Sequence, residues 1–118
     1  MRLLPAMKAA DPTIKIFVFD ECSLFKEDYE ALCGGRLDIT GKDDKGNWLI
    51  DGFTFHRYPN TREDYTRDNV VFTGPLSIRE QMLQLIEMME KADKKHGRTG
   101  DAKLNWGLTE VNVTTSNP

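Results

Sequence analysis

The chain has 118 residues, a length at which one hydrophobic core and one domain are expected. Its apolar fraction of 39%, with 2 Trp, 3 Tyr and 6 Phe, excludes the composition of a disordered chain. The formal net charge of −3 argues against a strongly basic, nucleic-acid-binding class.

The composition also bears on location and domain organisation. No window approaches the run of about eighteen apolar residues that a membrane-spanning helix needs. Pro5 and Lys8 interrupt the N-terminal apolar stretch, which is therefore too short for the core of a secretory signal. We expect one domain over residues 1–118, with a frayed or lightly docked start at 1–12, in the cytoplasm of its own cell or of a host.

The first third of the chain predicts a strand, a helix and a second strand. Residues 14–19 are apolar on both faces, as in a central strand. Ser23 is a candidate cap for a helix that ends at Gly34, where glycine permits the left-handed stop. Residues 36–40 alternate like a half-buried strand, and 41–47 have turn chemistry.

The middle of the chain predicts further extended segments. Residues 48–50 and 53–55 continue the alternating pattern, with a bulge or tight bend at 51–52. A polar loop is expected over 59–68 and another strand over 69–73.

A helix over 77–96 has the clearest sequence signal. Ser77 and Glu80 have the spacing of a capping box, and Gly97 follows the last turn. The apolar stripe at helical spacing consists of Ile78, Met82, Leu85, Ile86 and Met89. The tail over 104–113 alternates and predicts one or two closing strands.

These elements predict an α+β fold in the order β-α-β-β-β-α-β. Too few helices alternate with strands for a doubly wound sheet. We therefore expect a mostly antiparallel sheet of about five strands with two helices packed on it.

Three chemical interpretations deserve consideration. In the first, the apolar segment 16–19 is followed by Asp20 and Glu21, which resembles the end of a Walker-B strand. A small metal-dependent hydrolase using these acids, with help from His56, is thus an alternative function. However, the chain has no phosphate-binding loop to accompany such a strand, and the two acids also suit the polar start of a helix.

The second interpretation concerns thiols and imidazoles. The borderline metal ligands are Cys22, Cys33, His56 and His96, and none forms a closely spaced ligand pair. We therefore expect no metal, no cofactor and no catalytic residue. A cysteine thiolate with His56 as base is the only nucleophilic arrangement that these residues allow. Free, buried thiols are expected, although a disulfide between the two cysteines remains open.

The third interpretation concerns single-stranded nucleic acid. Segment 56–67 interleaves cations with aromatic rings, the mixture that holds phosphates and stacks on bases. The residues concerned are Arg57, Tyr58, Arg62 and Tyr65. Acidic residues within the same segment offset these cations, so nucleic acid is the less favoured partner.

The uneven charge distribution favours a protein partner instead. Residues 20–30 hold five acids and one lysine, and Glu27, Asp28 and Glu30 share the surface of the expected helix. Leu83 and Met88 widen the apolar surface of the 77–96 helix beyond one sheet contact. These features predict a non-catalytic binding protein, an inhibitor or accessory factor of phage or mobile-element type. It would dock on a basic partner such as a nucleic-acid-processing complex. A homodimer through the 77–96 helix would use the same apolar surplus.

Overall fold

The computed structural model describes residues 3–18, 26–57 and 74–111. In chain order the elements are α1 (Leu3–Ala10), β1 (Phe17–Val18), α2 (Lys26–Leu32), β2 (Gly52–Arg57), α3 (Gly74–His96), η2 (Gly100–Ala102) and β3 (Asn105–Val111). None of the described helices is long and apolar enough to cross a membrane.

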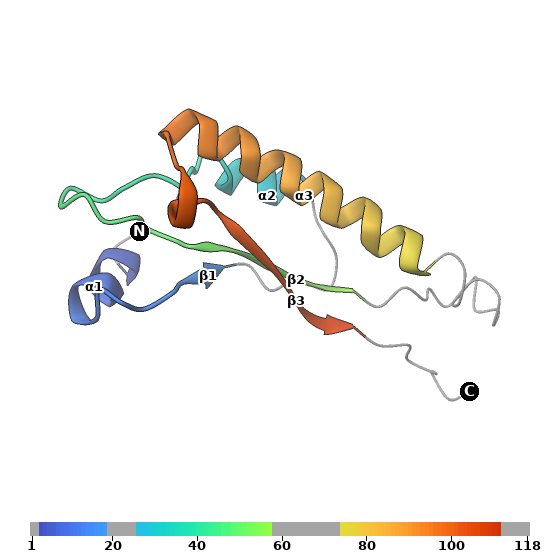
Figure 1. The fold of residues 1–118 in the computed structure, drawn as a ribbon, viewed down its shortest axis with the longest axis horizontal. Helices are drawn as coiled ribbons and strands as arrows, with labels where there is room; N and C mark the ends of the chain where they lie inside the picture. Colours follow the sequence, from blue (N-terminus) through green and yellow to red (C-terminus); the bar gives the residue numbers. More distant parts are fainter. Residues whose placement is uncertain (1–2, 19–25, 58–73, 112–118) are drawn as a thin grey trace.

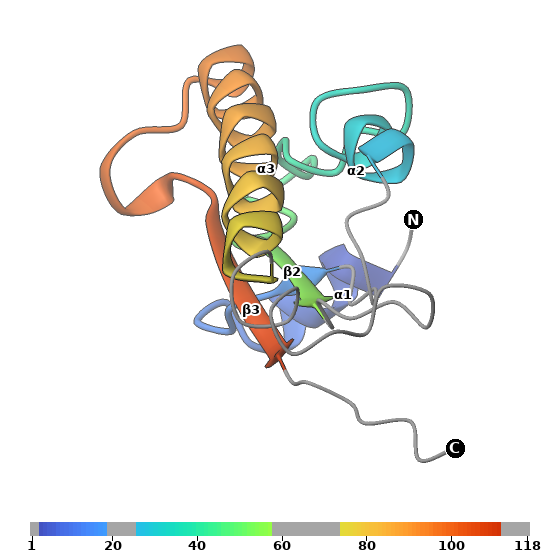
Figure 2. The same cartoon turned by 90° about the vertical axis from the view of Figure 1, so that its right-hand side faces the viewer.

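The described strands form one parallel sheet in the order β1-β2-β3. Phe17 pairs with Gly52, and Gly52 in turn pairs with Asn105. Successive parallel strands require crossover connections, which contain α2 and α3. Both helices lie on the same side of the sheet, and α1 lies on the other side near the start of β1 (Figures 1 and 2).

The expected antiparallel sheet of about five strands with two helices is therefore wrong. The chain does combine helices and strands, but its described part has three α-helices and a three-stranded, all-parallel sheet. Alternating side chains mark a strand without revealing its direction, because both pairings have the same two-residue period.

Two predicted strands in the first half do not form. In segment 36–40 the amides of Leu37 and Ile39 donate back to carbonyls of α2, so this segment completes the helix end. In segment 48–50, Trp48 makes only an isolated antiparallel bridge with Lys42 across the predicted turn. The predicted strand at 69–73 and the loop at 59–68 lie outside the described residues.

The position of β1 also differs from the prediction. Residues 14–19 predict a central strand, whereas β1 comprises two residues at the edge of the described sheet, and Phe17 is 42% exposed. The ring of Phe17 covers Gly52. A Cβ atom at Gly52 would come within 2.6 Å of that ring and 2.1 Å of the Asn105 carbonyl oxygen. Glycine therefore allows the strands to approach at this position.

The predicted second helix is confirmed and is slightly longer than expected. It starts at Gly74, so Ser77 lies inside the first turns and not at the cap. The core forms between α2, α3 and the sheet. Phe53 and Phe55 of β2 point toward these helices and are fully buried. The Tyr29 ring of α2 lies 5.8 Å from that of Phe53, centre to centre.

Candidate interaction surface

The predicted acidic residues lie on α2, at its exposed surface. Glu27, Asp28 and Glu30 are all exposed, whereas Tyr29 between them is buried in the core. The Lys26 ammonium lies 3.6 Å from a Glu30 carboxylate oxygen, so one of the three charges is partly offset. Glu27 and Asp28 have no ion pair within the described ranges and form the acidic surface of the helix.

The structure separates the two apolar residues predicted to contact a partner. Leu83 is 48% exposed on α3, whereas Met88 is only 8% exposed and belongs to the core. On α3 the buried residues include Leu85, Met89 and Ala92, which face the sheet and α2. Leu83 lies on the opposite side of the helix, because residues two positions apart are separated by about 200° around the axis.

A groove lies between α3 and β3 that was not predicted from the sequence. It has a volume of about 280 Å³. Its lining comprises Ile86, Met89, Glu90, Asp93, Lys103, Leu104, Asn105 and Trp106. Trp106 is 40% exposed at the strand edge. The parallel pairing of β3 with β2, through the crossover that contains α3, brings these residues together.

Asp93 and Arg98 fix the inner wall of this groove. A carboxylate oxygen of Asp93 accepts a hydrogen bond from the Leu104 amide at 3.1 Å and lies 3.5 Å from Nε of Arg98. Arg98 is 3% exposed and donates to the carbonyl oxygens of Thr40, Ile50 and Ala102. The start of β3 is therefore rigidly attached to the C-terminal end of α3.

A second polar cluster lies around Asp38, beside the same helix end. Its carboxylate accepts hydrogen bonds from the side chains of Thr40, Lys95 and His96. Burial alone would raise the pKa of Asp38, but these bonds outweigh it and hold the pKa well below its ordinary value. The cluster joins the loop after α2 to α3, which is a structural role.

The cysteine–histidine interpretation gains no geometric support from Cys33. Its thiol is buried, and burial, followed by the nearby Asp38 charge, raises its pKa to about 12. A thiol with that pKa is protonated at neutral pH and is a poor nucleophile. His56 lies on β2 with its Nδ1 3.8 Å from a Glu110 carboxylate oxygen, and His96 binds Asp38. Cys22 lies outside the described residues.

The remaining predicted site residues are mostly outside the described ranges. Asp20 and Glu21 fall there, as do Tyr58, Arg62 and Tyr65 of the predicted nucleic-acid loop. Arg57 is at the end of β2 and donates two hydrogen bonds to the Ser77 hydroxyl oxygen. Within the ranges that can be described, no group of three or more His, Cys, Asp or Glu side chains is arranged to hold a metal ion.

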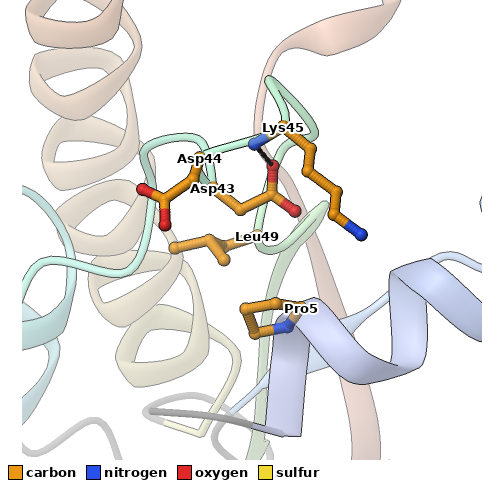
Figure 3. Close-up of a pocket in the computed structure, with 5 residues that line it drawn as sticks. All are labelled: Pro5, Asp43, Asp44, Lys45 and Leu49. Atoms are coloured by element: carbon orange, nitrogen blue, oxygen red, sulfur yellow. Dashed lines mark hydrogen bonds between the residues drawn. The ribbon is translucent and has the colours of Figure 1, made fainter.

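An open pocket of about 290 Å³ lies where α1 approaches the 41–47 turn (Figure 3). It is lined by Pro5, Asp43, Asp44, Lys45 and Leu49. One carboxylate oxygen of Asp43 accepts hydrogen bonds from the backbone amides of Lys45 and Asn47, and the other accepts a hydrogen bond from the Asn47 side-chain amide. Asp43 therefore stabilises its own turn, and the pocket has no converging set of polar groups.

Comparison of the chain with protein-family models, with curated proteins and with solved structures finds no match.

Proposed function

We propose that this chain is a non-catalytic protein-binding module that docks on a basic partner through the outer surface of α2 and α3. The observation that carries this proposal is the exposure of Glu27, Asp28 and Leu83 on one helical layer. Exposed acidic groups suit electrostatic attraction of a basic partner, and an exposed apolar side chain suits burial at an interface.

The apolar residue makes the stronger contribution to this argument. Glu27 and Asp28 lie in the first turn of α2, where negative charge also stabilises the helix itself. The half-exposed Leu83 has no such local explanation, because it contributes little to the core that α3 builds through its opposite face. An inhibitor or accessory factor acting in the cytoplasm, of phage or mobile-element type, is the role we infer.

The test compares two charge reversals in the same chain. The partner is first isolated on the tagged protein at low salt and identified, and its affinity is then measured by calorimetry. The double variant Glu27→Lys/Asp28→Lys should bind at least about tenfold more weakly and show a flatter salt dependence.

The control is the single variant Asp44→Lys, which reverses one exposed acid in the 41–47 turn, away from the helical layer. It should leave affinity within about twofold of the wild type. Equal losses in both proteins would show a general charge effect, and unchanged affinity in the α2 variant would contradict the proposed surface.

A further inference from the structure

Strand β3 lies at the edge of the sheet that the described residues form. Within the described part of the chain its only strand neighbour is β2. The Asn105 amide donates to the Asp51 carbonyl oxygen, so the backbone of Asn105 faces β2. Backbone groups alternate in direction along a strand. The N–H and C=O groups of Trp106 and Leu108 therefore point away from β2, toward the outer edge.

The groove described above runs beside this edge. Trp106 pairs with Phe53, whose side chain is buried beneath the helices, so Trp106 also lies on the helix side of the sheet. Ile86 and Met89 of α3 form the facing wall. An extended chain lying along β3 would thus find backbone partners at the edge and an apolar recess next to them.

We propose that β3 and this groove bind an extended segment of the partner protein, which adds to the sheet as a fourth strand. Every second side chain of such a strand points to the helix side. A large apolar side chain at one of these positions enters the recess between Ile86, Met89 and Trp106. This inference rests on the proposed function and adds a second contact between the chain and that partner.

The charges at the groove favour a basic residue beside that apolar anchor. Glu90 on the α3 side is exposed and has no ion pair among the described residues, whereas the charge of Asp93 is matched by Arg98. Lys103 lies on the other side of the groove. Because the whole chain carries −3, the long-range potential also favours a basic segment over an acidic one.

The length of the contact is limited by an irregularity in β3. The pairing shifts after Phe55, so that His56 pairs with Glu110 and Thr109 is an extra residue. Such a bulge twists the strand and disrupts further pairing. The added strand is therefore expected along residues 105–108, which is sufficient for the recess beside Trp106.

The first test uses three synthetic heptapeptides and the full-length protein labelled with nitrogen-15. The first peptide alternates Thr and Val around a central Phe and carries Lys two positions on either side of it. The second has Glu in place of Lys, and the third has Ser in place of Phe. We expect the first to shift the amides of residues 86–90 and 105–108. The other two should bind at least about tenfold more weakly.

Variants of the edge and of the groove test the two contacts separately. Leu108→Pro removes one outward N–H group while leaving the groups that face β2, a substitution that edge strands tolerate. It should weaken binding of the first peptide by at least about tenfold. Glu90→Lys should also weaken binding of that peptide, whereas Lys103→Glu should strengthen it. If the proline variant loses its native spectrum, Ile86→Glu, which places a carboxylate in the recess, provides the same comparison.

Several results would overturn this inference. These are the absence of binding by all three peptides, shifts confined to other residues, or full affinity in both Leu108→Pro and Ile86→Glu. A wild-type dimer that Leu108→Pro converts to monomer would assign the edge to a second copy of the chain instead. The Glu27→Lys/Asp28→Lys protein should retain peptide binding. If this variant loses only the natural partner, the loss is assigned to the α2 surface and not to the β3 edge.

Discussion

The phenolic hydroxyl of Tyr29 on α2 donates a 2.7 Å hydrogen bond to the carbonyl oxygen of Thr54 in the middle of β2. This bond attaches the shorter crossover helix to the central strand of the sheet, next to the Phe53 ring. Since Tyr29 is fully buried, its hydroxyl depends on partners inside the protein.

Tyr29→Phe should lower the free energy of unfolding by about 1–2 kcal/mol, because the Thr54 carbonyl loses a donor while the ring packing is retained. Urea denaturation followed by circular dichroism measures this change. Leu37→Ala removes an exposed side chain and should change stability by less than about 0.5 kcal/mol. Equal effects in the two variants would contradict a specific role for the hydroxyl.

Arg98→Met should be the most destabilising change near the groove, by about 3–5 kcal/mol, since it leaves the buried Asp93 carboxylate without its cation. The comparison is Lys42→Met, because Lys42 and Arg98 both contact the ring of Trp48. The Arg98 guanidinium carbon lies 4.2 Å from the Trp48 ring centre and the Lys42 ammonium lies 4.5 Å from it. Lys42 is exposed, so its loss should cost under about 1 kcal/mol. A thermal melt in which both variants behave alike would refute the structural role of Arg98.

Stability should fall in acid because two carboxylates, the buried Asp51 and the partly buried Asp38, have lowered pKa values. Burial opposes ionisation of Asp51, but hydrogen bonds from Lys8, the Ile16 amide and Lys15 outweigh burial and lower the pKa of this carboxyl. The hydrogen bonds that Asp38 accepts lower its pKa in the same way. A carboxylate with a folded pKa below its unfolded value stabilises the fold fully above the unfolded pKa of about 4. That stabilisation is lost as the pH falls toward the folded pKa.

The corresponding measurement is the free energy of unfolding between pH 6 and pH 2. It should decline below about pH 5, and the decline should be smaller in Asp38→Asn than in the wild type. The exposed Asp44→Asn protein should follow the wild-type curve. An identical acid decline in Asp38→Asn would show that Asp38 does not contribute to it.

The Cys33 thiol should resist modification in the native protein, because it is buried and its pKa is raised to about 12. A Cys22→Ser variant isolates its reaction with a disulfide reagent at pH 8. Labelling should be slow under native conditions and fast in urea. Rapid native labelling would contradict the packing between α2 and α3 and would restore the nucleophilic interpretation.

The sequence predicted helices better than strands, for reasons visible in particular residues. The apolar stripe from Ile78 to Met89 has a period that only a helix satisfies, and α3 follows it. In segment 36–40, Leu37 and Ile39 alternate with polar residues in the sequence, as on one face of a strand. In the structure Leu37 is exposed and Ile39 is buried, and the amides of both donate to α2 carbonyls. An alternating sequence therefore does not determine where the backbone finds its hydrogen-bond partners.

The candidate surface was predicted only in part. Charge and composition identified Glu27, Asp28 and Leu83, all of which are exposed. Met88, which was grouped with Leu83 as a partner contact, is buried in the core, because α2 packs on that side of α3. Trp106 was recognised as a strand residue, but its proximity to Ile86 depends on the parallel crossover, which the side-chain pattern does not encode.

The parallel sheet also has a consequence for how this chain must fold. Neither of the two described strand pairs can form as a local hairpin, because an entire helical crossover separates Phe17 from Gly52 and Gly52 from Asn105. Each pairing requires closure of a long loop before any ladder energy is gained, which favours slow folding. During synthesis β1 and β2 can meet while β3 is still unmade, and for that interval β2 itself is the exposed edge.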